Sequence, residues 1–311
     1  RGWQGRLIPQ VGRFWVIAHT GVRLAWRTAW LRRLLLFSWL PAVYVGALFL
    51  AYEQLLAPGS VGEAFIPWIR EIPLSNNRHQ VWSCLLWVFF RYPQIILMVL
   101  IVGQVAPPLV SQDVRTKAFL LYFSRPLARF EYVLGKLAVV WFYMAMVSTV
   151  PALALYVLGV LLSPDIGTVL STWDLPLRIL GASAVLMVPT AAVALALSSL
   201  TTETRYATFG WFALCILSTA TYGVLRGFLP LSADLQRWSL LSLHHTLGTV
   251  EYWAFGLKHE LAGHVVPLAS HIGFLPAPSQ MHVWPAAVEL IVITLVALAI
   301  LFRRVSSPMR V

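Results

Sequence analysis

Residues 137–161 read LAVVWFYMAMVSTVPALALYVLGVL and contain no charged side chain. A helix needs about 20 mainly apolar residues to cross the ~30 Å hydrocarbon layer of a bilayer, so this stretch predicts a transmembrane helix. Further runs of the same kind lie at 34–56, 88–110, 177–199, 206–226 and 285–302. The sequence therefore predicts an all-α, polytopic membrane protein with six transmembrane helices.

The overall composition agrees with this fold class. Of 311 residues, 59% are hydrophobic and 11% are charged, whereas about a quarter of the residues of a soluble domain are charged. An intrinsically disordered chain is excluded because it combines low hydrophobicity with high charge. The net charge of +11 would suggest nucleic acid in a soluble protein, but here the arginines flank apolar runs. We expect no nucleic-acid partner.

The distribution of basic residues predicts the orientation of the bundle. Most of the arginines and lysines fall in alternate segments, and loops rich in these residues stay on the cytoplasmic side. Both termini are therefore expected in the cytoplasm, with the protein integral to a bacterial inner (cytoplasmic) membrane. We expect a single transmembrane domain over 1–311, made of an N-terminal segment, a six-span bundle and a cytoplasmic tail at 1–33, 34–302 and 303–311.

The N-terminal segment predicts an amphipathic helix in the inner headgroup layer. Trp15, Trp26 and Trp30 recur at helical spacings, and Arg23 and Arg27 lie one turn apart, as in helices that lie flat in the interface. Short helices and turns are expected for the Pro- and Gly-containing residues 57–87.

A second unusual segment, residues 227–284 between spans five and six, is too apolar for a solvated loop. It predicts an outer helical insertion, which lies on the interface or re-enters the bundle.

Small residues are frequent in the fourth predicted span. Small side chains allow transmembrane helices to approach closely, and here they favour packing inside the bundle over a dimer seam. The alanines concerned are Ala182, Ala184, Ala191, Ala192, Ala194 and Ala196.

The chain lacks the common catalytic motifs. It contains no G-x-x-x-x-G-K-[ST], no G-x-G-x-x-G and no G-x-S-x-G, so it is not expected to hydrolyse ATP or to be an enzyme by itself.

The ionisable residues of the spans argue against an ion-coupled carrier. Near the outer ends of the spans lie Glu53, Arg91, Arg178 and Glu289. A proton- or sodium-coupled carrier would place carboxylates or open carbonyls near the midplane instead.

Histidines cluster in the insertion at 227–284. The sequence HELAGH from His259 to His264 resembles H-E-x-x-H, but its second histidine comes one residue later, about 100° further round a helix and off the shared face that zinc needs. No metal site is predicted. A looser site formed by His244, His245, His259 and His264 remains an alternative.

The segment at 111–136 is longer than a tether requires. Ser111 and Asp113 are expected to start a short amphipathic helix that breaks before Pro126. Its aromatic residues, among them Phe119 and Tyr122, would suit docking into a groove of a cytoplasmic partner. A helix resting on the inner leaflet explains the same pattern.

The stretch from Gln104 to Lys136 carries a family resemblance. An acidic residue and Arg-Thr-Lys follow the second span, Ser124-Arg125-Pro126-Leu127-Ala128-Arg129 comes next, and Gly135-Lys136 opens the third span. This pattern resembles the permease subunits of ABC transporters of the class-two (type V exporter) membrane-domain family. The six spans, the amphipathic N-terminal segment and the short second inner loop are similar in outline.

The resemblance implies a half-transporter that exports a hydrophobic or amphipathic substrate. Two copies, or one copy and a homologous permease, would bind two ATP-binding-cassette ATPase subunits, which hold ATP and Mg²⁺; this chain would bind no cofactor directly. Membrane lipids are further partners, and the insertion leaves room for an outer accessory protein. The implied residues of the ATPase contact are Asp113, Arg115, Lys117, Phe119, Tyr122, Arg125, Pro126 and Arg129, with Glu203 and Arg205 in a second inner contact.

Two alternatives belong to other functional classes. The first is a membrane scaffold that recruits a cytoplasmic ATPase without transporting anything, which would account for the large outer insertion. The second is a subunit that handles a metal or haem through the outer histidines.

Overall fold

The structure is a computed structural model of the chain. It describes residues 13–56, 78–118, 127–163, 167–228, 238–257 and 283–306. Every regular element within these ranges is helical, which confirms the all-α class. Among the described residues, six helices are long and apolar enough to cross a membrane, namely Ala29–Leu55, Ile96–Arg115, Arg129–Leu162, Leu175–Leu200, Thr204–Leu225 and Val283–Ser306.

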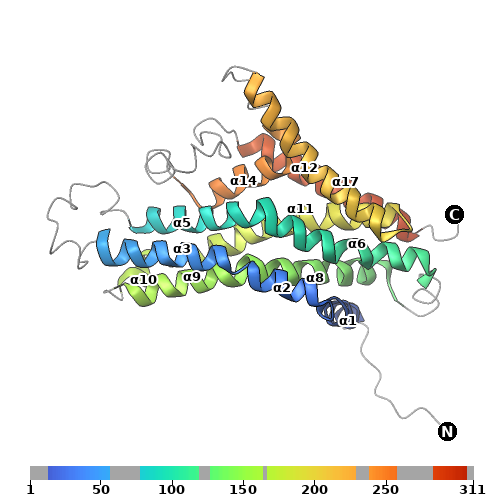
Figure 1. The fold of residues 1–311 in the computed structure, drawn as a ribbon, viewed down its shortest axis with the longest axis horizontal. Coiled ribbons are helices and arrows are strands. Elements are labelled where there is room, and N and C mark those ends of the chain that lie inside the picture. Colours follow the sequence, from blue (N-terminus) through green and yellow to red (C-terminus); the bar gives the residue numbers. More distant parts are fainter. Residues whose placement is uncertain are drawn as a thin grey trace, which may run out of the picture.

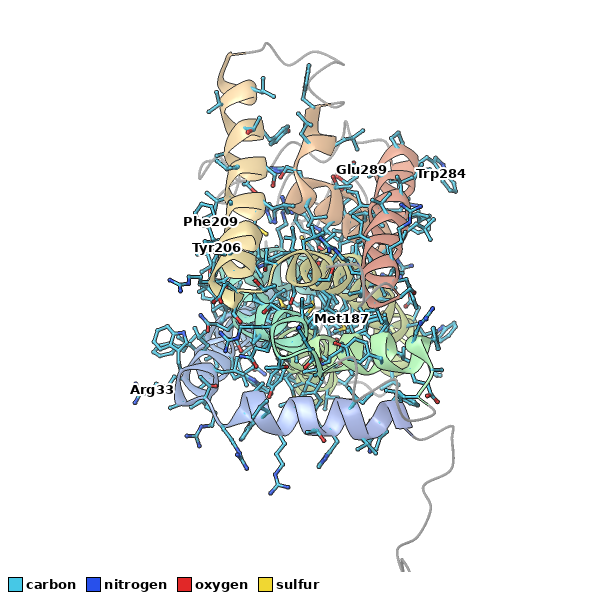
Figure 2. All side chains as sticks on the ribbon, turned by 90° about the vertical axis from the view of Figure 1, so that its right-hand side faces the viewer. Arg33, Met187, Tyr206, Phe209, Trp284 and Glu289 are labelled. Atoms are coloured by element: carbon cyan, nitrogen blue, oxygen red, sulfur yellow. The ribbon has the colours of Figure 1, made fainter. Side chains whose placement is uncertain are left out.

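The N-terminal region contains a helix that crosses the others. Helix α1 (Arg13–Trp26) is followed by α2 (Ala29–Phe37), α3 (Leu40–Ala51) and the π-helical turn η2 (Tyr52–Leu56). In Figure 1 α1 is seen nearly end-on below the end of the bundle, and in Figure 2 it runs across the view. It therefore lies across the bundle axis, the direction required for the predicted interfacial helix.

The second span is longer than its sequence suggested. Helix α5 (Arg78–Pro93), the π-helical turn η4 (Gln94–Met98) and α6 (Val99–Arg115) follow one another without a gap. Their combined length is about 57 Å at 1.5 Å per residue, well beyond the hydrocarbon layer. The expectation of short helices and turns up to residue 87 is therefore wrong for its last ten or so residues, whereas 57–77 lie outside the described residues.

Polar contacts with other spans hold the start of α5 at Arg78 and His79. The Arg78 guanidinium lies 3.1 Å from the buried Glu53 carboxylate, and His79 Nε2 lies 2.9 Å from Asp174. Although partial burial acts in the opposite direction, the hydrogen bonds from His79 and Arg178 lower the pKa of Asp174. These contacts fix the start of α5 against the first and fourth spans.

The third span is interrupted in its middle. Helices α8 (Arg129–Val147) and α9 (Thr149–Leu162) meet at Ser148, whose hydroxyl donates to the carbonyl of Met144. Pro151 follows within one turn and has no N–H to continue the helical hydrogen bonds. The short α10 (Gly167–Ser171) then leads to the fourth span.

The fourth and fifth spans, α11 (Leu175–Leu200) and α12 (Thr204–Phe228), differ most in burial. In α11 67% of the most apolar stretch is buried, against 11% in α12. Of the alanines expected to pack inside the bundle, all except Ala184 are buried, which confirms that prediction for them. Figure 1 shows α12 leaning away from the other helices as it approaches Phe228.

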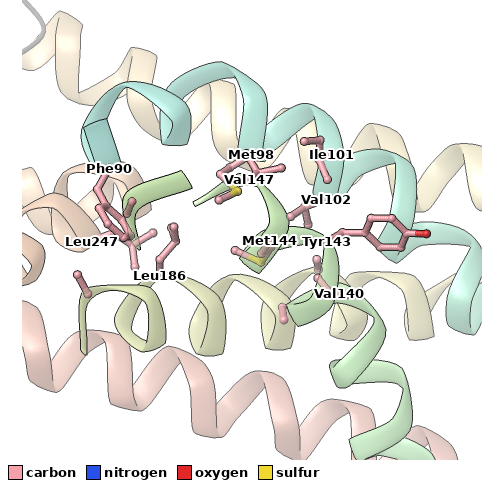
Figure 3. Close-up of a cluster of buried hydrophobic side chains, with 14 of the residues drawn as sticks. Phe90, Met98, Ile101, Val102, Val140, Tyr143, Met144, Val147, Leu186 and Leu247 are labelled. Carbon is pink, nitrogen blue, oxygen red and sulfur yellow. The ribbon is translucent and has the colours of Figure 1, made fainter. Parts of the chain in front are cut away.

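The insertion between the fifth and sixth spans is mainly helical where it is described. It contains the turn η5 (Ser239–Leu241) and α14 (Leu243–Ala254), and α17 (Val283–Ser306) completes the bundle. Helix α14 packs against α11, α12 and α17, so it belongs to the bundle. Figure 3 shows Leu247 of α14 near Leu186 and Phe90, in the same apolar cluster as Met144 and Val102.

Candidate coupling site

The end of α6 carries the first predicted contact residues. Ser111 and Asp113 were expected to begin a new helix, but both lie in the last turns of α6. The Ser111 hydroxyl donates to the carbonyl of Pro107 one turn earlier, at 2.7 Å. The prediction was wrong because a serine in a helix can bond back to its own preceding turn, so the Ser-x-Asp pattern does not distinguish a helix start from a helix interior.

A hydroxyl from the fourth span joins α6 to α11. Ser198 Oγ donates to the carbonyl of Pro107 at 2.6 Å and accepts the N–H of Ser111 at 3.0 Å. In a regular helix that N–H and that carbonyl would bond to each other. The Ser198 hydroxyl thus bonds to both of these α6 groups, and it fixes the register of α6 against the most buried span.

Asp113 holds the same end of α6 to α8. Its carboxylate lies 2.7 Å from Lys136 Nζ and accepts a 2.7 Å hydrogen bond from the Tyr132 hydroxyl. The side chains of Asp113 and Lys136 are only 15% and 10% exposed. In this structure the Asp113 carboxylate is engaged within the chain, where it positions α6. Its contact with an ATPase stays a prediction.

The two predicted inner contacts meet in the structure. The Ser111 and Thr204 hydroxyls lie 3.0 Å apart, and Arg115 Nη1 lies 3.8 Å from Glu203 Oε2. Both partners of that ion pair are more than a third exposed, so it contributes at most about 1 kcal/mol to stability. The end of α6 and the turn between α11 and α12 therefore form one continuous surface.

Basic side chains cover this surface. Arg115, Lys117, Arg129 and Arg205 are all exposed, while the residues beneath them are tied to α8 and α11. We call Arg115, Lys117, Glu203 and Arg205 the coupling surface. Its exposed guanidinium groups can bind carboxylates in a planar, bidentate manner.

Several predicted site residues fall outside the described part of the chain. Phe119, Tyr122, Arg125 and Pro126 lie in the segment 119–126, which the structure does not describe. Helix α8 begins soon after it, where the Glu131 carboxylate accepts the N–H of Ala128 at 3.0 Å.

The sequence alone gave no role to Tyr132 or Ser198, both of which hold α6 in place. An isolated Lys136 at the start of an apolar run was the available signal for a buried ion pair.

The histidines of the insertion between spans five and six form no metal site among the residues that the structure describes. His245 Nδ1 lies 2.9 Å from Ser242 Oγ, and Arg91 Nη1 lies 3.4 Å from His244 Nδ1. A guanidinium group beside the ring opposes a bound cation. His259 and His264 lie outside the described residues.

Comparison with protein-family models and with curated proteins found no match for this chain.

Lys117 offers a test of the surface that does not disturb the fold. It has a φ of 54°, in the left-handed region that glycine adopts without steric cost and that often ends a helix. We expect Lys117→Gly to leave the thermal unfolding midpoint unchanged or slightly higher, because the lost side chain is exposed. A clear fall in the midpoint would show that Lys117 supports the fold.

Proposed function

We propose that this chain is the transmembrane permease subunit of an ATP-driven transporter, of the ABC exporter type. Its substrate would be a hydrophobic or amphipathic molecule, and separate soluble subunits would bind Mg²⁺ and hydrolyse ATP. The observation that carries the proposal is the convergence of the α6 end and the α11–α12 turn on one exposed basic surface.

The contacts beneath the coupling surface support a mechanical role. A partner bound at Arg115 and Arg205 would act on α6 and on the turn at Glu203. Because Ser198 joins α6 to α11 and Asp113 joins it to α8, a displacement there would be transmitted to the buried spans. Coupling requires a difference in contact between two states of the bundle, and this arrangement provides a rigid element through which that difference can act.

The proposal includes an orientation and an assembly. The coupling surface and both termini would face the cytoplasm of a bacterial inner membrane. Two copies, or one copy and a homologous permease, would each bind one ATPase subunit.

Copurification with an ATPase tests the proposal. The chain would be purified gently from its native membrane, and the accompanying soluble subunits would be identified by mass spectrometry. We expect the triple variant Arg115→Ala/Lys117→Gly/Arg205→Ala to reduce ATPase recovery and permease-stimulated ATP turnover by about tenfold or more, a loss of about 1.4 kcal/mol of binding free energy.

A matched control removes the same charge elsewhere. Arg23, Arg32 and Arg33 are exposed on α1 and α2, and Figure 2 shows Arg33 projecting from the side of the bundle. The triple alanine variant at these positions should retain ATPase recovery and turnover. Equal losses in both triple variants would indicate general electrostatic attraction and contradict the proposed surface.

Reconstituted vesicles distinguish transport from scaffolding. ATP-dependent movement of a lipid or amphiphile by the purified complex would exclude a scaffold that only recruits an ATPase. Stable ATPase association without movement of any tested amphiphile would favour the scaffold.

A further inference from the structure

A cavity of about 430 Å³ lies between α6, α11, α12 and α14. This volume falls within the range of small-molecule sites in proteins. Its walls are mainly apolar and include Leu186, Trp211, Ile216 and Leu247. Trp211 is fixed in place by the hydrogen bond from its indole N–H to the carbonyl of Val99, at 2.9 Å.

The position of the cavity determines what can reach it. Of the four helices that enclose it, α6, α11 and α12 belong to candidate membrane spans. Helix α12 is little buried and leans away from the bundle beside the cavity (Figure 1). A ligand would thus enter from the hydrocarbon layer, which selects molecules with an apolar chain.

Two polar groups lie on the cavity wall without partners. Thr190 and His244 both line the cavity, and Thr190 Oγ1 and His244 Nε2 are buried and have no hydrogen-bond partner among the described residues. Buried polar groups are usually hydrogen-bonded, because an unmet one is costly in free energy. Two residues with such atoms on one cavity wall suit a ligand that carries polar atoms of its own.

The contact with Arg91 determines which ring nitrogen of His244 carries the proton. Its Nη1 donates to the His244 carbonyl at 2.6 Å and lies 3.4 Å from His244 Nδ1. A guanidinium group can only donate, so Nδ1 accepts and the neutral ring carries its proton on Nε2. Burial, followed by the charges of Arg91 and His245, lowers the pKa of His244 well below 6.5, which agrees with a neutral ring.

Arg91 has a buried acidic neighbour. Glu251, which is fully buried, interacts electrostatically with Arg91. Gly248 allows the guanidinium to lie against α14, since a Cβ atom there would collide with it. The wall therefore presents a neutral N–H donor, and it does not call for an anionic ligand.

We propose that this cavity is a binding site for a lipid-like molecule with one apolar chain and an uncharged, hydrogen-bond-accepting oxygen, such as that of an ester. The chain would lie against Leu186, Ile216 and Leu247, and the oxygen would accept from His244 Nε2. The site is formed within one copy of the chain, and its occupancy does not depend on ATP or on an ATPase.

Photolabelling of the purified chain tests the site. The probe is a monoacylglycerol with a diazirine in its acyl chain, and the labelled residues are located by mass spectrometry. We expect labels on the parts of α12 and α14 that line the cavity. Gly223 lines the cavity, and a Cβ atom there would meet nothing within 4 Å, so Gly223→Phe should fill the space and reduce labelling by about tenfold or more.

Gly210 provides the matched control. It lies in α12, a Cβ atom there also meets nothing within 4 Å, and it is not part of the cavity wall. Gly210→Phe should leave labelling unchanged. Labels spread over the exposed face of α17, with no difference between the two variants, would mean that only the surrounding lipid layer was detected and would overturn the proposal.

Competition tests the role of His244. Unlabelled monooleoylglycerol should displace the probe about three- to tenfold more effectively than octadecene, which has the chain but no oxygen; this is the range expected for one hydrogen bond. His244→Phe should abolish the difference, and His244→Gln, which restores an N–H donor, should recover part of it. An unchanged preference in His244→Phe would remove His244 from the site.

Discussion

Methionine in place of Lys136 is expected to lower the free energy of unfolding by about 3–5 kcal/mol, because it leaves the buried Asp113 carboxylate without its charged partner. The Tyr132 hydroxyl would then be the remaining donor to that carboxylate among the contacts described above. A single neutral hydrogen bond does not compensate an ion taken out of water. The effect is measurable as a loss of thermal stability by tryptophan fluorescence in detergent micelles.

A fully apolar replacement provides the control. In the triple variant Asp113→Leu/Tyr132→Phe/Lys136→Met, no charged or hydroxyl group remains at the cluster. Replacing a buried ion pair by apolar residues of similar volume is often neutral or stabilising, so we expect most of the lost stability to return. If the triple variant were as unstable as Lys136→Met, the loss would come from packing and the buried ion pair would not be its cause.

Leucine in place of Gly135 is expected to separate α1 from α8. A Cβ atom at this position would lie 2.9 Å from Ile17 and 3.0 Å from the carbonyl oxygen of Phe14. The approach is close from both sides, since a Cβ atom at Gly21 would lie 2.6 Å from Val139. Overpacking typically costs 1–3 kcal/mol, more than the roughly 0.8–1 kcal/mol that removing a helical glycine gains.

The readouts for Gly135→Leu are stability and the packing of α1. The Tyr143 hydroxyl donates to the carbonyl of Val22 at 2.8 Å, and displacement of α1 would break this bond. We expect a lower thermal midpoint and faster proteolysis within α1. Gly181→Leu is the control, because a Cβ atom there meets nothing within 4 Å; equal loss in both variants would argue against a close α1–α8 contact.

Hydropathy was sufficient to predict the spans because a bilayer requires long apolar helices. The start of α5 was not predictable in this way. Arg78 and His79 gave residues 57–87 the character of a loop, but their partners Glu53 and Asp174 lie 25 and 95 residues away. A pattern read along the chain does not show such distant pairing, which is what makes charged residues compatible with a buried helix.

The candidate site was predicted in part for a similar reason. Arg115, Lys117, Glu203 and Arg205 were expected at two separate contacts, and the structure places them on one surface. The buried contacts of Ser198 and Lys136 join helices that are far apart in the sequence. Residue type alone did not distinguish Asp113, which is engaged inside the chain, from its exposed neighbours.

The hydrogen bonds between the Ser198 hydroxyl and α6 have a mechanical consequence. Because Ser198 of α11 bonds to a carbonyl and an N–H of α6, α6 cannot slide or rotate past α11 without breaking these bonds, so the two helices move together. Bending must then be taken up where the helices depart from regular geometry. The π-helical turn at Gln94–Met98, which leads directly into α6, is such a place, and it would bend when force is applied at Arg115.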